Sequence, residues 1–275
     1  MTRPADLDLL GQAPREQASW PDRWLDKWYR QRPGWINGTE EFHALCARHI
    51  TRGSEILEIG CGPGNRTSEF LATTLGRTHG LDPDPAAQAN PFLQSCRRLT
   101  GPVYPFPDGT FDAAVSDYVV EHIAQPAEHL REVLRVLRPG SVYVLRTPNL
   151  WHYVAIVSAL TPHWFHVMVA NRLRRLPAGS REPYPTLYRM NAARAIRRLS
   201  KEIGFNVRSI LMIEKEPSYA VLSRALFVAG LTYERIVNQY DLFAPFRANI
   251  FAVLEKPSSS EASPSEPQDG LYRAR

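Results

Sequence analysis

The sequence predicts an α/β fold in which a mostly parallel sheet is covered by helices on both faces. Two observations lead to this prediction. Between residues 55 and 146, short apolar runs typical of strands alternate with amphipathic helical segments, the pattern of repeated strand–helix–strand units. The first strand also runs directly into a glycine-rich turn and a helix start, which is how α/β folds hold a ligand at the carboxyl edge of the sheet.

The first half of the chain divides into a cap and the first strands. Residues 1–50 are expected to form an N-terminal extension and helical cap, because aromatic residues from Trp20 to Phe42 recur at roughly helical spacing. The apolar run 56–59 predicts a strand and residues 67–74 the helix that follows its glycine turn. A second strand is expected at 78–81, ending at Asp82, before proline-rich residues 83–91 and a short helix.

The next elements continue the alternation. Residues 111–115 predict a strand, and residues 127–137 a helix with apolar side chains at three- and four-residue spacing. Arg138-Pro139-Gly140 ends this helix, and residues 142–146 form the next strand. An aromatic and arginine-rich insertion is expected at 149–189.

The last part predicts a helix at 191–203 closed by Gly204, a strand at 207–213, a helix at 218–237 and a strand at 246–254. The final two strands are expected to pair antiparallel. From residue 258 to 275 the serine, proline and glutamate content predicts a disordered tail.

Composition favours a cytoplasmic enzyme. The 275 residues are 44% hydrophobic and 22% charged, with a net charge of +5, ordinary values for a globular protein. Three scattered cysteines make neither a disulfide framework nor a metal site. The polar N-terminus lacks a signal peptide, and the most apolar stretch, 154–170, is interrupted by Pro162, His163 and His166. We therefore expect a soluble or at most peripheral chain.

The glycine turn favours a cationic ligand. Gly60, Gly62 and Gly64 follow the spacing Gly-x-Gly-x-Gly, which differs from the Gly-x-Gly-x-x-Gly turn of dinucleotide-binding enzymes. Glu58 at the end of the strand would repel a pyrophosphate but suits a positive charge. These details favour S-adenosylmethionine over NAD.

Three sequence blocks together resemble class I S-adenosylmethionine-dependent methyltransferases over about residues 53–256. They are Leu57-Glu58-Ile59-Gly60-Cys61-Gly62-Pro63-Gly64, then Gly80-Leu81-Asp82, then the segment from Tyr104-Pro105-Phe106-Pro107-Asp108 through Glu121-His122 to Arg138-Pro139-Gly140. The resemblance implies a Rossmann-like, seven-stranded, mostly parallel sheet with an antiparallel last strand, in a methyltransferase domain spanning 51–257. It also implies methyl transfer from S-adenosylmethionine.

The resemblance assigns the cofactor site. Glu58 would lie near the methionine end, where it either contacts the ammonium group or organises the glycine loop. Asp82 would accept the ribose hydroxyls, with Asp84 as the nearby alternative, and Pro83 would lie against the adenine. Cys61 is expected to be a small loop residue rather than a nucleophile. The predicted cofactor-binding residues are Glu58, Gly60, Cys61, Gly62, Gly64, Asp82, Pro83, Asp117 and Tyr118.

The chemistry is expected just beyond the fourth predicted strand, at Asp117, Tyr118, Glu121 and His122. Methyl transfer mainly requires alignment, but a hydroxyl acceptor also needs a base. His122 and His152 are the two candidate bases, and Asp117 is a third candidate catalytic residue. Each histidine is also compatible with a purely structural role. No metal is expected.

An arginine cluster indicates the acceptor. Residues 172–198 hold eight arginines and a single glutamate, Glu182, a composition that suits phosphate, carboxylate or a sugar-linked group, although a solvated helix face explains it equally well. The predicted substrate-binding residues are Arg172, Arg175, Tyr188 and Arg189. The stretch 117–255 also resembles uncharacterised bacterial methyltransferases associated with surface polysaccharides. Residues 151–170 are interpreted as a lid in preference to a membrane contact.

The alternatives belong to other functional classes. A methyltransferase of RNA or protein is disfavoured, because the basic residues lie in an insertion and no Asn-Pro-Pro-Tyr-type motif follows the fourth strand. A binding protein that kept the fold without the chemistry is disfavoured by the intact Gly60, Gly62, Gly64 and Asp82. The sequence indicates no obligate protein partner.

Overall fold

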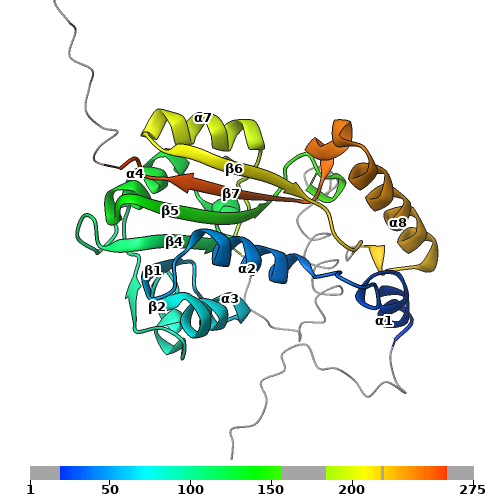
Figure 1. The fold of residues 1–275 in the computed structure, drawn as a ribbon, viewed down its shortest axis with the longest axis horizontal. Coiled ribbons are helices and arrows are strands. Elements are labelled where there is room, and N and C mark those ends of the chain that lie inside the picture. The colour runs from blue at the N-terminus through cyan, green and yellow to red at the C-terminus, as the bar shows by residue number, and fades with distance from the viewer. Residues whose placement is uncertain (1–18, 156–183, 218–219, 259–275) are drawn as a thin grey trace, which may run out of the picture.

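The computed structural model describes residues 19–155, 184–217 and 220–258, and in Figure 1 a central sheet lies between layers of helices. Its strand order is β3-β2-β1-β4-β5-β7-β6. The strands are β1 (Ser54–Ile59), β2 (Gly76–Asp82), β3 (Ser95–Arg98), β4 (Phe111–Asp117), β5 (Leu137–Pro148), β6 (Asn206–Ile213) and β7 (Asn249–Glu255). All pairs are parallel except those of β7, which is antiparallel to both neighbours. The predicted seven-stranded, mostly parallel sheet is confirmed.

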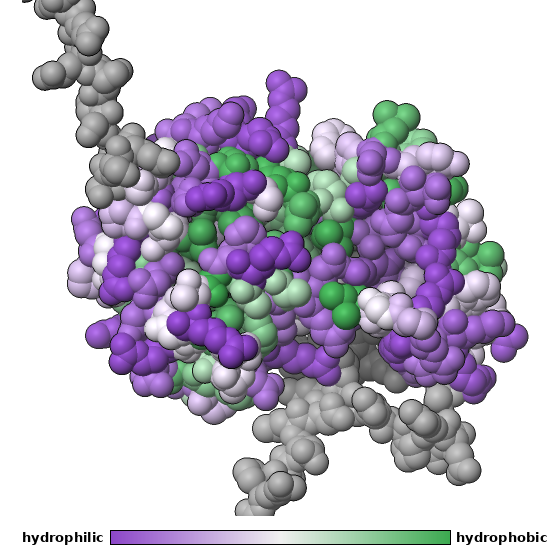
Figure 2. Space-filling view, viewed as in Figure 1, coloured by the Kyte–Doolittle hydropathy of each residue, from purple (hydrophilic) through white to green (hydrophobic). Residues whose placement is uncertain are grey.

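Helices cover both faces because the strands alternate apolar side chains between them. Leu57 belongs to a core shared with α4 (Pro126–Val136) and α7 (Ala193–Ile203), whereas its neighbour Ile56 belongs to a core shared with α2 (Gly38–His49) and η3 (Leu71–Leu75). Successive strand residues point to opposite faces, so two adjacent apolar residues serve two cores. Figure 2 shows hydrophobic side chains over the part of the sheet between α2 and α7. The outer faces of these two helices are hydrophilic.

The remaining helices lie around the edge to which the parallel strands point. They are α1 (Trp20–Leu25), the π-helix η2 (Asp26–Arg30), α3 (Arg66–Phe70), the short 3₁₀ turns η4 (Pro85–Ala89), η5 (Val120–His122) and η7 (Asp241–Phe246), and α8 (Arg224–Gln239). In Figure 1, α1 and α8 lie beside one another at this end of the molecule. Trp24 of α1 contacts Phe227 of α8 edge to face, with ring centroids 5.4 Å apart.

Several elements differ from the sequence prediction. Strand β5 begins at Leu137 rather than 142, so Arg138-Pro139-Gly140 lies in the strand and not between helix and strand, and β7 begins at Asn249 rather than 246. The edge strand β3, with the sequence Ser-Cys-Arg-Arg, was missed because an exposed four-residue edge carries no apolar alternation. The last helix begins at Arg224 rather than 218, because Ser223 accepts a hydrogen bond from the N–H of Leu226 and caps it there. Residues 259–275 of the predicted tail, the first 18 residues and residues 156–183 of the predicted insertion lie outside the described residues.

None of the helices in the described part of the chain is long and apolar enough to cross a bilayer.

Candidate functional site

The predicted cofactor residues meet at the carboxyl edge of β1, β2 and β4. Glu58, Asp82 and Asp117 stand at or next to the ends of these three neighbouring strands. The glycine loop joins the end of β1 to α3, and the N–H of Gly60 continues the ladder by donating to the carbonyl of Leu81 at 2.8 Å. The structure therefore gathers a loop and three carboxylates in one place.

The glycine loop needs glycine for conformation and for space. Gly60, Gly62 and Gly64 have φ values of +72°, +54° and +119°, a region that residues with a side chain rarely adopt. A Cβ at Gly60 would clash with Cγ2 of Val119, whereas a Cβ at Gly62 would meet nothing within 4 Å. The loop is thus packed underneath at Gly60 and open at Gly62, as a bare-backbone cradle for a ligand requires.

Glu58 is a buried carboxyl group with one oxygen unused. Its Oε1 accepts a hydrogen bond from the hydroxyl of Ser68 at 3.0 Å. Its Oε2 has no hydrogen-bond partner among the described residues, although the side chain is only 2% exposed. Burial raises the pKa of Glu58 to about 8. Since a buried polar atom without a partner is costly, this oxygen fits a site for a cationic group such as the methionine ammonium of the expected cofactor.

Asp82 holds the glycine loop. Its Oδ2 accepts the N–H of Gly62 at 2.9 Å and its Oδ1 accepts the N–H of Asp84 at 2.7 Å. Each carboxylate oxygen can accept a second hydrogen bond, so the predicted ribose contact stays a prediction. The competing Asp84 instead caps η4 by accepting the N–H of Ala86 at 2.9 Å. Pro83 lies exposed beside them.

Cys61 fills a gap under the loop. It is fully buried, and its Sγ lies 3.8 Å from Sγ of Cys96 on β3. Burial raises the pKa of the Cys61 thiol. The protonated thiol therefore dominates at neutral pH, which agrees with the predicted packing role and disfavours nucleophilic chemistry.

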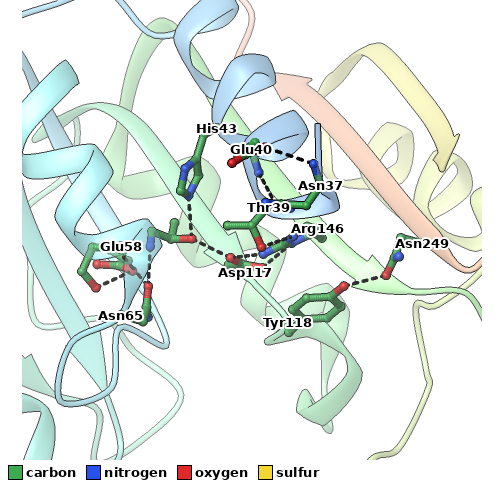
Figure 3. Close-up of polar contacts among 12 residues, drawn as sticks. Asn37, Thr39, Glu40, His43, Glu58, Asn65, Asp117, Tyr118, Arg146 and Asn249 are labelled. Atoms are coloured by element: carbon green, nitrogen blue, oxygen red, sulfur yellow. Dashed lines mark hydrogen bonds and ion pairs between the residues drawn. The ribbon is translucent and has the colours of Figure 1, made fainter. Parts of the chain in front are cut away.

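Asp117 is engaged by a buried arginine. Nε and one terminal nitrogen of Arg146 donate to Oδ1 and Oδ2 of Asp117, each at 2.5 Å. The hydroxyl of Thr67 donates to the same carboxylate at 2.7 Å, and His43 Nε2 lies 3.1 Å from that hydroxyl. Figure 3 shows this chain of contacts running from His43 to Asp117 and on to Arg146. A carboxylate held by this many donors is poorly suited to act as a base, so its predicted catalytic role is not favoured by the geometry.

Tyr118 has an unusual backbone. Its φ of +57° is in the left-handed region, which costs a non-glycine residue about 1–2 kcal/mol. Its N–H donates to the carbonyl of Arg146 at 2.9 Å, and its hydroxyl donates to Oδ1 of Asn249 at 2.8 Å. The Arg146 guanidinium lies 4.5 Å from the ring centroid. These contacts hold the tyrosine at the site edge, where 41% of it stays exposed.

His122 and Glu121 lie one turn beyond β4. His122 Nδ1 lies 3.1 Å from the carbonyl oxygen of Pro185, which can only accept a hydrogen bond, so Nδ1 carries the hydrogen and Nε2 keeps its lone pair. Nε2 is 3.9 Å from Oε1 of the buried Glu121. Glu121 accepts a hydrogen bond from the Thr147 hydroxyl at 3.0 Å, and burial raises the pKa of Glu121 to about 7. A partly exposed imidazole with an acceptor nitrogen suits a general base.

His152 lies in a different environment. It is 4% exposed and packs against Tyr153 and Tyr233, with ring centroids at 4.2 and 5.7 Å. Its Nε2 is 3.5 Å from Oε2 of Glu214, and burial lowers the pKa of His152 to about 4. Enclosed in this way, His152 is a poor candidate for contact with an acceptor, and the geometry favours His122 between the two predicted bases.

The predicted acceptor residues divide into two groups. Tyr188 and Arg189 lie next to η5, because the N–H of Tyr188 donates to the Glu121 carbonyl at 3.1 Å and Arg189 donates to the Ala124 carbonyl at 2.7 Å. The structure thus brings them beside His122. Arg172 and Arg175 lie outside the described residues.

Sequence reasoning missed Arg146, Thr67 and His43. Arg146 ends a strand in the sequence, where an isolated arginine gives no signal of the ion pair that it forms. Thr67 was seen only as a helix start and His43 only as part of an N-terminal cap. The one available signal was the polar residue Asn65 just after the loop, whose side chain accepts the N–H groups of Thr67 and Ser68 and so starts α3.

Comparison with known proteins identifies relatives. Residues 25–210 match a family model described as a methyltransferase domain. A probable S-adenosylmethionine-dependent methyltransferase of Mycolicibacterium smegmatis is 35% identical over 105 residues, which are 37% of this chain and 40% of that protein. The match therefore spans about two fifths of the curated relative's own length.

Solved structures share the fold at low identity. The putative methyltransferase in a complex with the Trm112 activator of Haloferax volcanii superposes with a TM-score of 0.55 at 18% identity, covering 86% of this chain and 94% of that chain. The [4+2]-cyclase SpnF superposes with a TM-score of 0.52 at 17% identity, covering 82% and 84% of the two chains.

Proposed function

The chain belongs to the family of methyltransferase domains that use S-adenosylmethionine, and on this premise we propose that it moves a methyl group to the oxygen of a small-molecule or sugar-type acceptor. The observation that carries the cofactor part is the buried, unpartnered Oε2 of Glu58 beside an open glycine loop. The observation that favours an oxygen acceptor is the acceptor nitrogen Nε2 of His122 at the same edge of the sheet.

Each residue has a distinct task in this reaction. The cofactor, when bound, supplies a sulfonium methyl group for in-line displacement. Glu58 would bind the ammonium group of the cofactor, and the glycine loop would present bare backbone to it. His122 accepts the hydroxyl proton of the acceptor at Nε2 as the oxygen–methyl bond forms and the sulfur–methyl bond breaks.

The proposed acceptor is anionic or sugar-linked. Tyr184 lies beside His122, with ring centroids 6.2 Å apart, and Tyr188 and Arg189 lie next to Glu121. Aromatic rings and a guanidinium group suit sugar faces and carboxylate or phosphate oxygens. Arg172 and Arg175 stay proposed acceptor contacts on the sequence alone.

Two alternative functions, each of another functional class, also stand as proposals. One is a methyltransferase of RNA or protein. The other is a protein that binds S-adenosylmethionine without transferring the methyl group. The fold neighbour SpnF is described as a [4+2]-cyclase, so the fold by itself does not determine the reaction.

Calorimetric titration tests the proposal first. We expect S-adenosylmethionine and S-adenosylhomocysteine to bind with micromolar affinity and NAD not to bind. Absence of binding by both cofactor forms would contradict the proposal. Binding of both without transfer to any hydroxyl compound in an acceptor screen would favour the non-catalytic alternative, and a salt-dependent gel shift with bulk tRNA would favour the RNA alternative.

Gly62→Ala is expected to weaken cofactor binding while the protein remains folded. The added methyl meets no protein atom within 4 Å, but it occupies the face of the loop on which the cofactor would lie, so we expect affinity to fall at least about tenfold. Gly109→Ala is the matched control, because Gly109 has a similar φ of +57° and equally open surroundings in a distant turn. Both variants should lose about 1–2 kcal/mol of stability. Equal affinity in the two variants, measured by calorimetry, would contradict the assigned loop.

A further inference from the structure

Strands β4 and β5 carry an aspartate–arginine pair at each end. At the end where the strands begin, Asp112 pairs with Arg138 in an exposed position. At the carboxyl edge, Asp117 pairs with Arg146, whose side chain is only 5% exposed. The same two residue types on the same two strands are therefore solvated at one end and buried beside the cofactor site at the other.

Arg146 is held on every side. Its guanidinium lies 5.0 Å from the ring centroid of Phe42 on α2 and 4.5 Å from that of Tyr118. One terminal nitrogen also donates to the hydroxyl of Thr39 at 3.2 Å. A buried guanidinium that is stacked and hydrogen-bonded in this way has one defined orientation, which Figure 3 shows pointing at Asp117.

The network continues from Asp117 to Glu58 through one helical turn. Thr67 and Ser68 are neighbours at the start of α3, and the Thr67 hydroxyl donates to Asp117 while the Ser68 hydroxyl donates to Glu58. Because the Thr67 hydroxyl proton is used, its oxygen accepts from Nε2 of His43. Burial lowers the pKa of His43 to about 4, so this histidine contributes no charge near pH 7.

Two carboxylates are thus bound to adjacent hydroxyl groups, and they influence one another. After burial, the nearby charge of Asp117 is among the causes that raise the pKa of Glu58. Arg146 opposes this effect because it places a positive charge against Asp117. Without Arg146, the partly buried Asp117 would stand uncompensated close to Glu58.

We propose that Arg146 is a positioning residue of the cofactor site, which neutralises Asp117 so that Glu58 can ionise and bind the ammonium group of S-adenosylmethionine. The inference rests on the proposed function. At the cofactor site Arg146 acts through Asp117, its ion-pair partner, since its guanidinium is buried against Phe42 and Tyr118.

Several other titratable groups lie around Glu58. Desolvation and the neighbouring groups together set its ionisation, and those neighbours come from every element packed against it. They are Asp82 from β2, Asp117 from β4, Cys61 from the glycine loop, Cys96 from β3 and Cys46 from α2.

The test is the pH dependence of S-adenosylmethionine binding, measured by calorimetry from pH 6 to 9.5. In the wild-type protein, affinity should rise with pH until Glu58 is ionised. In Arg146→Met the midpoint should move up by about one pH unit, which weakens binding about tenfold at neutral pH and hardly at all at pH 9.5. Arg146→Lys should restore most of the wild-type midpoint, and Arg138→Met should leave it unchanged.

The double variant Asp117→Asn/Arg146→Met removes both charges and should return the midpoint to the wild-type value. This variant also covers the case in which Arg146→Met alone fails to fold, as judged by circular dichroism. A wild-type protein without affinity for S-adenosylmethionine would overturn the proposed function. If the wild-type protein binds S-adenosylmethionine and Arg146→Met has the wild-type midpoint, only the role of Arg146 is overturned. The same conclusion follows if the double variant has the same midpoint as Arg146→Met. A purely structural role would lower affinity equally at every pH.

Discussion

Replacing Glu58 by glutamine is expected to weaken S-adenosylmethionine binding by about 10- to 100-fold, the loss of a charge-assisted hydrogen bond. The glutamine keeps an oxygen for the Ser68 hydroxyl but cannot carry the negative charge that the ammonium group needs. Because the pKa of Glu58 is raised to about 8 by burial, binding to the wild-type protein at pH 7 should also release close to one proton. Glu58→Gln should release none from this position.

The same substitution should make the protein increasingly stable relative to wild type as the pH rises. Glu58 holds its proton in the folded protein up to about pH 8, whereas the unfolded chain loses it near pH 4.5. The folded state therefore binds more protons between these values, and the group's contribution to stability is lost progressively as pH rises through this window. Glu58→Gln removes this loss, so its unfolding free energy relative to wild type should increase from pH 5 to pH 8 by an amount of the order of a few kcal/mol.

Calorimetry in two buffers of different ionisation enthalpy measures the proton release, and thermal unfolding at pH 5 and 8 measures the stability difference. Glu55→Gln is the control, since Glu55 lies on the same strand but pairs with His79 and Arg77, and these contacts lower its pKa. It should leave cofactor affinity unchanged. Unaltered affinity in Glu58→Gln would show that Glu58 only organises the loop, which is the alternative that the sequence left open.

Replacing His122 by glutamine is expected to reduce kcat for a hydroxyl acceptor by about 100- to 1,000-fold, the usual contribution of a general base. Glutamine can still donate to the Pro185 carbonyl but cannot accept a proton. The affinity for S-adenosylmethionine should stay within about twofold, because His122 is not among the residues to which we assign cofactor contacts. Single-turnover methyl transfer to an acceptor found by screening, followed over pH 5 to 9 and at several S-adenosylmethionine concentrations, measures the transfer rate and the cofactor affinity.

The pH dependence of the methyl-transfer rate tests whether His122 is the base. The wild-type rate should fall at low pH, because a protonated imidazole cannot accept the hydroxyl proton of the acceptor. Glu121, 3.9 Å from His122, has a pKa raised to about 7 by burial. This acid limb should disappear in His122→Gln and persist in the control His79→Gln, a distant β2 residue paired with Glu55. Full activity in His122→Gln would exclude it as the base, and loss of activity in His152→Gln instead would assign the role to the other predicted histidine.

The sequence alone was enough for six of the seven strands and the glycine loop, and the resemblance added the full sheet. The alternation of strands and helices depends on local apolar spacing, and the loop depends on glycines at three fixed positions, with φ values that other residues rarely adopt. Both are properties of short stretches of chain, so they can be recognised without knowing what lies beside them. The edge strand β3 was missed because exposed edges carry no such pattern.

Only the tertiary structure decided which polar residues are free to act. His122 and His152 are equivalent in sequence, yet one keeps an acceptor nitrogen at the edge of the site and the other is enclosed by tyrosines. Asp117 was predicted as a candidate catalytic residue, and Arg146, 29 residues later, was unnoticed until the parallel pairing of β4 and β5 placed them in register. Burial, desolvation and ion pairing arise from groups distant in the chain, so no local pattern records them.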